Sequence, residues 1–562
     1  MSFLGGGPKF VLLAILDGWG IAAPSAGNAI TQAKTPNISK FMASYPHTTL
    51  SASGKAVGLP RGEDGNTETG HLNLGAGRIV YQDLERINLA IADGTFFDNQ
   101  IFANAFSHVK KNNSALHLMG LVGSGGVHSD IDHLFSLIHM ASVNKIAKLF
   151  LHLFTDGRDS SPTSAKIYIE QVEEVLIKEK VGTIASIIGR YWAMDRDQRW
   201  DRTAKAYFAL TQGKGAMVKT PYEAIKKSYD AGKTDEFIEP SLILTDSKTP
   251  VALIKDGDAV VFYNFRIDRP RQLTKAFVLD DFSKANSLFE YDPYQVEYKK
   301  THIIKKAKPA EEAPFERGKK LKDLYFVTMT EYSKQITKEG GVPAFPPEMV
   351  KTPIGHVVSS QGLRQLRITE SEKERFVTFY FNGLRDTPFT NEERIIIPSP
   401  KVATYDKKPE MSSEEICKNL IDKIKAQQYE FIVVNFPNAD MVGHTGNLDA
   451  TIKAVEQIDK VLGDVANMVL AYEGALVITA DHGNAEEMLN LTTGGIDTEH
   501  SVNPVPFAVI ANYLLGNSKI LQSGILADVA PTILTLMNIQ VPSSMTGRNL
   551  LEGNKIDQPL QF

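Results

Sequence analysis

Carboxylate and imidazole side chains follow three short apolar runs of this chain. An acidic side chain at the end of a buried strand is costly unless it is paired or binds a metal. Asp440 and His444 can converge on one cation if their segment turns into a helix, although such a pair also arises by chance. His500 taken alone is more typical of a surface histidine. The full set of candidate ligands is Asp17, Asp440, His444, Asp481, His482 and His500.

The candidate ligands combine carboxylates with imidazoles and include no thiolate. Such a set suits Mn²⁺, and also Zn²⁺, Co²⁺ or Mg²⁺, with Mn²⁺ favoured where carboxylates are prominent. The residues are numerous enough for two ions. Two ions about 3.5–4 Å apart stabilise both the attacking and the leaving oxygen of phosphoryl transfer. The sequence therefore predicts two divalent metal ions and phosphoryl-transfer chemistry.

A hydroxyl side chain that could serve as the nucleophile lies in the segment Gly65–His71. Thr67 stands there in a glycine-flanked turn before an expected helix. One interpretation is structural: Thr67 caps the helix, and Glu68 interacts favourably with its positive end. The other interpretation is that the Thr67 hydroxyl is the nucleophile. The two are compatible, because a helix N-terminus also binds phosphate.

Guanidinium groups cluster in three segments, at residues 156–159, 189–196 and 264–269. The planar fork of arginine binds carboxylate and phosphate through two hydrogen bonds, so a substrate with both groups would need several arginines. Each segment also contains aspartate, and arginine–aspartate neighbours are more often structural ion pairs. The candidates for anion binding are Arg158, Arg190, Arg196, Arg266 and Arg269.

The elements that must position these residues are buried strands. Apolar runs at residues 10–16, 431–435 and 475–479 alternate with amphipathic stretches such as 451–469. This alternation is typical of a parallel sheet covered by helices on both faces. Ligands bind beyond the carboxyl ends of the strands in such sheets. We therefore expect the three acidic strand ends to lie at one edge of one sheet.

The middle of the chain repeats the alternation, with strands expected at residues 115–121, 148–154, 183–188 and 259–264. A second α/β domain is therefore expected there, inserted into the first. The charged stretch 298–322 is typical of a solvated linker or surface excursion.

Composition argues against several classes of protein. A chain of 562 residues is too long for one ordinary core, and its net charge of −5 argues against a general nucleic-acid binder. The single cysteine, Cys417, allows no internal disulfide and no cysteine-rich zinc site. We expect it to be a small buried residue of a helix over 412–426. The longest N-terminal apolar run is too short to cross a membrane. The expectation is a soluble, cytoplasmic protein.

The chain resembles the cofactor-independent phosphoglycerate mutases from about residue 10 to about residue 550, because its motifs occur in that family's order. The resemblance implies an isomerase of glycolysis and gluconeogenesis, an intramolecular phosphotransferase that interconverts 3-phosphoglycerate and 2-phosphoglycerate without 2,3-bisphosphoglycerate. The motifs are Leu16–Gly20, Gly65–His71, Gly125–Ser129, Asp156–Asp159, Gly189–Arg196, Phe265–Arg269, Met329–Tyr332, Pro398–Tyr405, Asp440–His444, Asp481–Asn484 and Asn503–Pro506.

The resemblance also implies a fold and a set of ligands. The fold is an alkaline-phosphatase-like, doubly wound α/β domain (residues 1–80 and 324–562) interrupted by an α/β transferase domain (81–323), acting as a monomer. One metal would be held by Asp440, His444 and His500, and the other by Asp17, Thr67, Asp481 and His482. The phosphoglycerate pocket would contain His128, Arg158, Asp159, Arg190, Arg196, Arg266, Arg269 and Lys373.

Two departures from the family concern Thr67 and the region 280–322. The family usually has serine where this chain has Thr67; both carry a hydroxyl, but the extra methyl group restricts the rotamers and crowds the attacking oxygen. The region 280–322 is expected to be an insertion.

The resemblance implies that Thr67 attacks the phosphoryl group while Lys373 neutralises its oxygens and Asp159 exchanges protons with the glycerate hydroxyls. Closure of the two domains, with hinges near 79–83 and 322–326, would exclude water. Two alternatives stay open: a phosphatase of the same superfamily, and a catalytically silent metabolite-binding protein. The arginine set and His128 argue against the first, and the retained metal ligands argue against the second.

Overall fold

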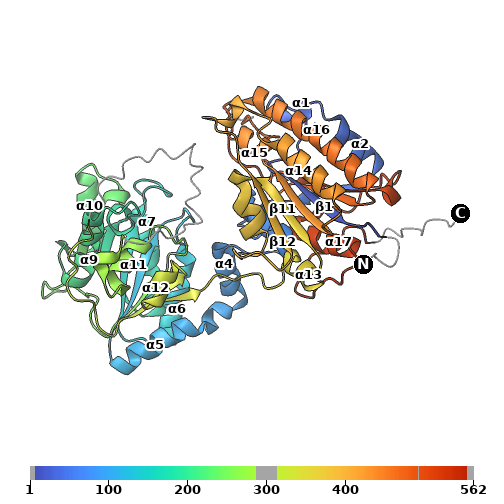
Figure 1. Ribbon diagram of the computed structural model, residues 1–562. Coiled ribbons are helices and arrows are strands. Elements are labelled where there is room, and N and C mark those ends of the chain that lie inside the picture. Colours follow the sequence, from blue (N-terminus) through green and yellow to red (C-terminus); the bar gives the residue numbers. More distant parts are fainter. Residues whose placement is uncertain (1–6, 287–312, 491–492, 553–562) are drawn as a thin grey trace. The chain divides into compact units, whose positions relative to one another are not determined.

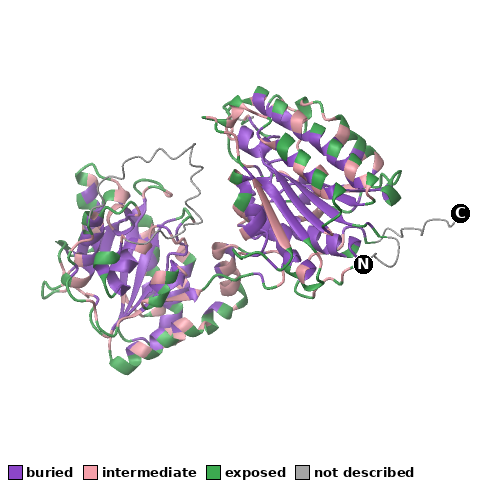
Figure 2. Ribbon diagram, viewed as in Figure 1, coloured by how far each residue is buried: buried purple, intermediate pink, exposed green. Residues whose placement is uncertain are grey.

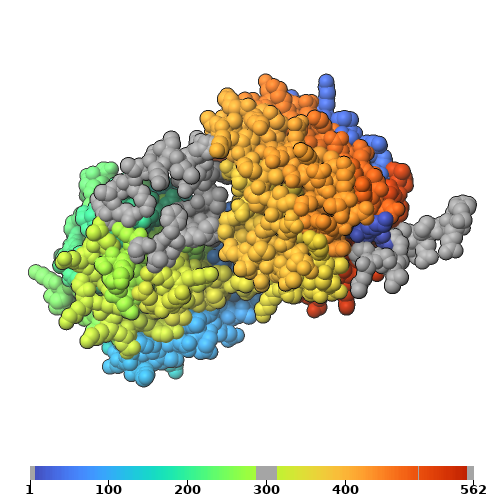
Figure 3. Space-filling view, viewed as in Figure 1, coloured from blue at the N-terminus to red at the C-terminus, as the bar shows by residue number. Residues whose placement is uncertain are grey.

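The computed structural model describes residues 7–286, 313–490 and 493–552. They form two compact units, and the chain passes from the first to the second between Gln82 and Asp83 and returns between Pro347 and Glu348. The first unit therefore contains both ends of the described chain. Figure 3 shows both of its segments, blue and yellow to red, at the surface of the same unit.

The first unit is built on a mostly parallel sheet, with eight strands among the described residues. The strand pairs are parallel except for β14 with β15 and β15 with β2. In spatial order the strands are β12 (Glu392–Ile397), β11 (Gln365–Glu370), β13 (Phe431–Phe436), β1 (Val11–Leu16), β14 (Ala475–Thr479), β15 (Val505–Ala511), β2 (His47–Ser51) and β16 (Gly524–Ile525).

Helices cover both faces of this sheet (Figure 1). Every residue of β1 is buried, because its run of six apolar side chains has a covered sheet face on either side. One face carries α1 (Ala29–Gln32), α2 (Pro36–Ser44), α14 (Ser413–Lys425) and α16 (Leu448–Ala471), and the other carries α3 (Thr67–Ala76), α13 (Ile354–Ser360) and α17 (Val529–Leu536).

The second unit holds another sheet with eight described strands, parallel except where β5 pairs with β7. Its order is β10 (Gly341–Phe345), β9 (Tyr325–Thr330), β8 (Ala259–Phe262), β3 (Leu116–Val122), β4 (Leu149–Thr155), β5 (Thr183–Gly189), β7 (Ser241–Ile243) and β6 (Ala216–Val218). One face carries α4 (Asp83–Asp93), α5 (Gln100–Asn112), α6 (Ile131–Val143), α7 (Ala165–Glu179) and α10 (Pro221–Asp230), and the other α8 (Arg190–Ala193), α9 (Trp200–Gln212), α11 (Arg271–Val278) and α12 (Lys334–Lys338).

The predicted fold class, a doubly wound α/β unit with a second α/β unit inserted into it, is confirmed. All seven predicted strands form, and in both units the central strands are buried while the outer helix faces are exposed (Figure 2). Cys417 is buried in α14, as predicted. No helix among the described residues is both long and apolar enough to span a membrane.

The chain returns from the second unit to the first at a later residue than the sequence predicts. The predicted boundary at 323/324, with a hinge over 322–326, would separate β9 from the second unit. Instead, β9 pairs with β8, and β10 pairs with β9 in turn, so the chain leaves this sheet only after Pro347. Strand pairing of this kind is a tertiary effect that the local pattern does not encode.

The predicted insertion over 280–322 is described only in part, since residues 287–312 lie outside the described residues. At its carboxyl end Arg317 is buried and donates hydrogen bonds to the carbonyl oxygens of Ala276 and Leu279, at 2.9 and 2.8 Å. This residue anchors the end of the segment to α11, which differs from the solvated linker expected for 298–322.

A buried histidine in α6 makes the second unit sensitive to acid. His133 is fully buried and contacts Asn88 Oδ1 at 2.8 Å through Nε2, and burial lowers its pKa to about 3. Because this pKa lies below the unfolded value of about 6.5, the stabilisation is present above pH 6.5 and is lost as the pH falls. Between pH 7.5 and 5, protonation of His133 in the unfolded state should lower the unfolding free energy of the wild type by about 2 kcal/mol. We expect this part of the decrease to be absent from His133→Phe. Urea denaturation at both pH values measures this, and an unchanged difference would contradict it.

Candidate active site

Three acidic residues meet at one edge of the first sheet, as the sequence predicts. Strands β13, β1 and β14 are adjacent and parallel. Asp17 follows β1, Asp481 lies beyond β14, and Asp440 lies in α15 (Asn438–Gly443) just beyond β13. All three side chains are fully buried. Burial of three carboxylates in one place requires compensating positive charge.

Lys373 supplies part of that charge. Its ammonium group is fully buried and lies 2.9 Å from Asp17 Oδ1, 2.8 Å from Asp440 Oδ2 and 3.1 Å from Thr67 Oγ1. The lysine follows β11, the strand that pairs with β13 on its other side. Lys373 therefore lies in the first unit among the candidate metal ligands, whereas the other residues predicted for the phosphoglycerate pocket lie in the second unit.

Thr67 is the first residue of α3, but it does not cap the helix. The side chain of Asn66 does so by accepting a hydrogen bond from the backbone N–H of Thr69 at 2.9 Å. The capping interpretation of Thr67 is therefore wrong, and its hydroxyl is directed elsewhere. Thr67 Oγ1 lies 2.9 Å from His482 Nε2 as well as close to Lys373. A buried hydroxyl beside an ammonium group and an imidazole is a plausible arrangement for a nucleophile.

The first candidate metal group contains Asp440, His444 and His500. The Nδ1 atoms of the two histidines contact the carbonyl oxygens of Thr498 and Gly65 at 2.7 and 2.9 Å. Since a carbonyl only accepts, Nδ1 is the donor in each ring, which leaves Nε2 of each ring to face Asp440. The two Nε2 atoms are 3.1 Å apart and lie 3.1 and 3.3 Å from Asp440 Oδ1. Three electron-rich atoms directed at one point suit a cation.

The second candidate group contains Asp17, Asp481 and His482. His482 Nε2 lies 3.4 Å from Asp17 Oδ1 and 3.5 Å from Asp481 Oδ2. Burial lowers the pKa of His482, but Asp481 and the other carboxylates outweigh burial and raise it to about 10. Asp481 Oδ2 is buried and accepts no hydrogen bond within the described structure: His71 Nδ1, 3.2 Å away, contacts the Thr67 carbonyl. A buried carboxylate oxygen without a hydrogen bond, together with the O/N donor set, fits a divalent metal ion.

The predicted arginine cluster forms at the carboxyl edge of the second sheet. Arg190 pairs with Asp156, and its Nη1 lies 2.5 Å from Asp159 Oδ2. Asp159 is also close to His128, whose Nε2 is 3.7 Å from the same oxygen. Strands β4 and β5 are neighbours, so the segments after them, which carry the aspartates and Arg190, meet at this edge.

A third carboxylate, Asp268, contacts the other members of the cluster. Its fully buried side chain lies 2.7 Å from Arg196 Nη1, 3.2 Å from Arg266 Nε and 3.6 Å from His128 Nδ1. Burial, followed by the charge of Arg190, lowers the pKa of His128 to about 2, so this imidazole is neutral at physiological pH. Asp268 was not predicted as a site residue, although the sequence shows it as the acidic residue of the segment Phe265–Arg269.

The remaining two arginines differ in exposure. Arg158 is about half exposed, with Glu236 at 3.9 Å. Arg269 donates a hydrogen bond to the Met194 carbonyl at 3.2 Å, and burial together with the charges of Arg190 and Arg196 lowers its pKa to about 10. Burial and the neighbouring guanidinium groups both disfavour the charged form of Arg269, and a bound anion would favour it.

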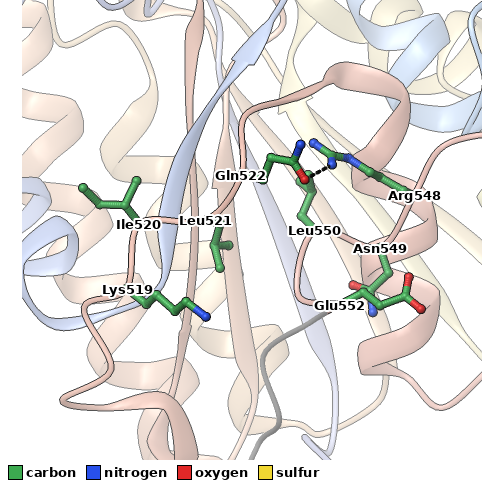
Figure 4. A pocket seen from close by; sticks show the side chains of 8 residues that line it. All are labelled: Lys519, Ile520, Leu521, Gln522, Arg548, Asn549, Leu550 and Glu552. Carbon is green, nitrogen blue, oxygen red and sulfur yellow. Dashed lines mark hydrogen bonds between the residues drawn. The ribbon is translucent and has the colours of Figure 1, made fainter.

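A surface pocket of about 530 Å³ lies elsewhere in the first unit and contains none of the predicted site residues (Figure 4). Arg548 donates a hydrogen bond to Gln522 Oε1 at 2.5 Å across it. The pocket residues are Lys519, Ile520, Leu521, Gln522, Arg548, Asn549, Leu550 and Glu552.

Comparisons with known proteins identify the family of this chain. The family model for the N-terminus of BPG-independent PGAM matches residues 87–334. The 2,3-bisphosphoglycerate-independent phosphoglycerate mutases of Chloroflexus aggregans and Clostridium novyi are each 48% identical, over 97% of this chain and 99% of their own. A solved structure of Leishmania mexicana phosphoglycerate mutase at low cobalt concentration is 28% identical, with a TM-score of 0.57, and covers 96% of this chain and 97% of its own. This chain belongs to the family of 2,3-bisphosphoglycerate-independent phosphoglycerate mutases.

Proposed function

We propose that this chain interconverts 3-phosphoglycerate and 2-phosphoglycerate through a phosphoryl group carried transiently by Thr67, with two divalent metal ions, most consistent with Mn²⁺, and no 2,3-bisphosphoglycerate. The observation that carries the proposal is the place of the Thr67 hydroxyl. It is not used for capping and lies 2.9 Å from His482 Nε2 and 3.1 Å from Lys373 Nζ. Both candidate metal groups adjoin it, since His482 Nε2 lies 3.4 Å from Asp17 Oδ1 and 3.9 Å from Asp440 Oδ1, and Lys373 contacts both of these aspartates.

The ligand assignment follows from the donor atoms. Asp440, His444 and His500 would hold one ion, and Asp17, Thr67, Asp481 and His482 the other. When bound, divalent ions polarise phosphoryl oxygens and make a hydroxyl more acidic. Lys373 adds a fixed positive charge beside Thr67 Oγ1, where negative charge develops as the phosphoryl group moves.

The reaction balances as two transfers of one phosphoryl group. The hydroxyl proton of Thr67 passes to solvent and Oγ1 forms a bond to phosphorus, while the bond between phosphorus and the 3-oxygen of glycerate breaks and that oxygen takes a proton from protonated Asp159. The glycerate then reorients. Its 2-hydroxyl gives its proton to Asp159 and forms a bond to phosphorus, while the bond between phosphorus and Thr67 Oγ1 breaks and Oγ1 takes a proton back from solvent.

Substrate recognition would come from the arginine cluster. Arg158, Arg190 and Arg196 would bind the glycerate carboxylate, while Arg266 and Arg269 would bind phosphoryl oxygens. His128 is held neutral, so it would donate or accept a hydrogen bond without adding charge. Arg269 is partly buried beside Arg190 and Arg196, and an anionic ligand would offset both the burial and the neighbouring charges that lower its pKa. We propose that the enzyme works in the cytoplasm as a monomer.

A phosphatase would need the residues of the first unit but not those of the second. Hydrolysis requires a nucleophile, metals and water, whereas isomerisation also requires that the dephosphorylated glycerate be retained. The arginine cluster, with His128 and Asp159, provides contacts for retaining it. This argument favours the mutase over the phosphatase.

The test is turnover of purified protein with 3-phosphoglycerate and Mn²⁺, without 2,3-bisphosphoglycerate, with 2-phosphoglycerate and free phosphate both measured. We expect 2-phosphoglycerate to form, a chelator to abolish turnover, and Mn²⁺ to restore it. Phosphate release without 2-phosphoglycerate would favour the phosphatase. Neither product, from folded protein that binds Mn²⁺, would favour a silent binding protein.

A further inference from the structure

One buried carboxylate near the candidate metal groups is not a candidate ligand. The side chain of Glu486 is only 2% exposed and accepts four hydrogen bonds. Its Oε2 accepts from the backbone N–H groups of Gly20 at 3.0 Å and Asn484 at 2.8 Å. Its Oε1 accepts from the Ser501 hydroxyl and from Asn503 Nδ2, the latter at 3.1 Å. A carboxylate with four donors is well satisfied despite its burial.

The four donors come from the three loops that carry most of the candidate ligands. Gly20 follows Asp17 by three residues, Asn484 follows His482 by two, and Ser501 directly follows His500. Thr67, Asp440 and His444 lie on other segments, and Asn484 reaches one of these by donating to Asp440 Oδ1 at 3.2 Å.

Backbone hydrogen bonds also join these three loops where they meet at Glu486, here called the junction. Ala485 N–H donates to the Gly18 carbonyl at 3.0 Å, and Ser501 N–H donates to the Gly483 carbonyl at 3.1 Å. A side chain on Gly20 or on Gly483 would overlap the Glu486 carboxylate. Both glycines are therefore needed for these loops to approach the carboxylate so closely.

We propose that Glu486 is a positioning residue that holds the loops of Asp17, His482 and His500 in the geometry required for divalent metal binding; this rests on the metal centre of the proposed function. Glu486 acts through the loops and does not contact the metal. The four donor groups of the loops occupy the acceptor positions of both oxygens of the Glu486 carboxylate. In Glu486→Gln, an amide N–H₂ group replaces one oxygen and must face two of these donors, which separates at least one loop from the junction.

The experiment compares metal binding with catalysis. Mn²⁺ is titrated into the metal-free wild type, Glu486→Gln and Glu487→Gln, and binding is measured by calorimetry. Glu487 is the matched control, because it is exposed and, within the described part of the chain, its side chain accepts a hydrogen bond only from Asn503, at 2.9 Å. We expect the Kd for Mn²⁺ to rise about 10- to 100-fold in Glu486→Gln and to stay within about twofold in the control. At saturating Mn²⁺, the kcat and the KM for phosphoglycerate should recover to within about threefold of wild type.

An unchanged Kd for Mn²⁺ in folded Glu486→Gln would overturn the inference, as would a loss of kcat that excess Mn²⁺ does not restore. If Glu486→Gln does not fold, Ser501→Ala removes one donor from Oε1 and is expected to raise the Kd about threefold or more; an unchanged value there overturns the inference equally. A wild type that binds no Mn²⁺ would instead overturn the metal centre of the proposed function, and this inference with it.

Discussion

Replacing Thr67 by alanine is expected to lower kcat for phosphoglycerate isomerisation by at least about 10⁴-fold, since removal of a nucleophile eliminates the covalent route. The KM or Kd for 3-phosphoglycerate should change only a few-fold, because the arginines proposed to bind it lie in the second unit. Incubation with 3-phosphoglycerate, followed by mass spectrometry, should show a phosphorylated peptide at residue 67 in the wild type and none in the variant.

Two substitutions serve as controls for Thr67→Ala. Thr67→Ser keeps the hydroxyl and removes the crowding methyl group, so turnover should equal or exceed that of the wild type. Thr69→Ala alters another buried threonine of α3 whose hydroxyl contacts Asn66 at 3.0 Å, and it should retain most activity. Full activity in Thr67→Ala would exclude Thr67 as the nucleophile. Background turnover in both wild type and Thr67→Ser, with phosphoglycerate still bound, would favour a silent binding protein.

The acidic edge of the first sheet was predictable from the sequence because its signals are local. An apolar run such as 475–479 followed by Asp481 encodes both a buried strand and the polar residue at its end. Parallel strands share the edge where ligands bind. The three runs before Asp17, Asp440 and Asp481 proved to be neighbouring strands, so the expected convergence of the carboxylates is confirmed.

Other parts of the site depend on contacts between residues far apart in the chain. Nothing local distinguishes Lys373 from other lysines beside glutamates, yet it pairs with Asp17 across 356 positions. Glu486 resembles its exposed neighbour Glu487 in sequence, but it accepts from Gly20 across 466 positions. The pairing of β9 with β8, which moves the second chain crossing to Pro347, is equally non-local.

The capping alternative for Thr67 shows how a local signal can mislead. Asn66 and Thr67 are both residues that favour helix N-caps. In the structure the cap is Asn66, one position earlier. The Thr67 hydroxyl is therefore not used for capping and is a candidate nucleophile. Helix ends are commonly displaced by one or two residues relative to sequence expectation, and here one residue decides the interpretation.

Replacing Lys373 by methionine is expected to lower both stability and activity, and Mn²⁺ is expected to restore the stability but not the activity. The substitution removes a buried ammonium group from Asp17, Asp440 and Thr67 Oγ1 at nearly constant volume. Two buried carboxylates then lose a partner, so the unfolding free energy of the metal-free protein should fall by about 3–5 kcal/mol. Bound Mn²⁺ would supply positive charge to the same carboxylates, so saturating Mn²⁺ should recover most of that stability.

Activity should not recover with the stability. The Lys373 charge beside Thr67 is proposed to stabilise the phosphoryl group in transfer, and loss of one such group costs about 10²–10³-fold in kcat. Urea denaturation with and without Mn²⁺, together with kcat at saturating Mn²⁺, separates the two effects; Lys418→Met, at an exposed position of α14, is the control. Wild-type turnover in Mn²⁺-loaded Lys373→Met would limit this lysine to balancing charge in the metal-free protein. Low turnover with full stability would place its charge in the reaction, where the metal ions do not substitute for it.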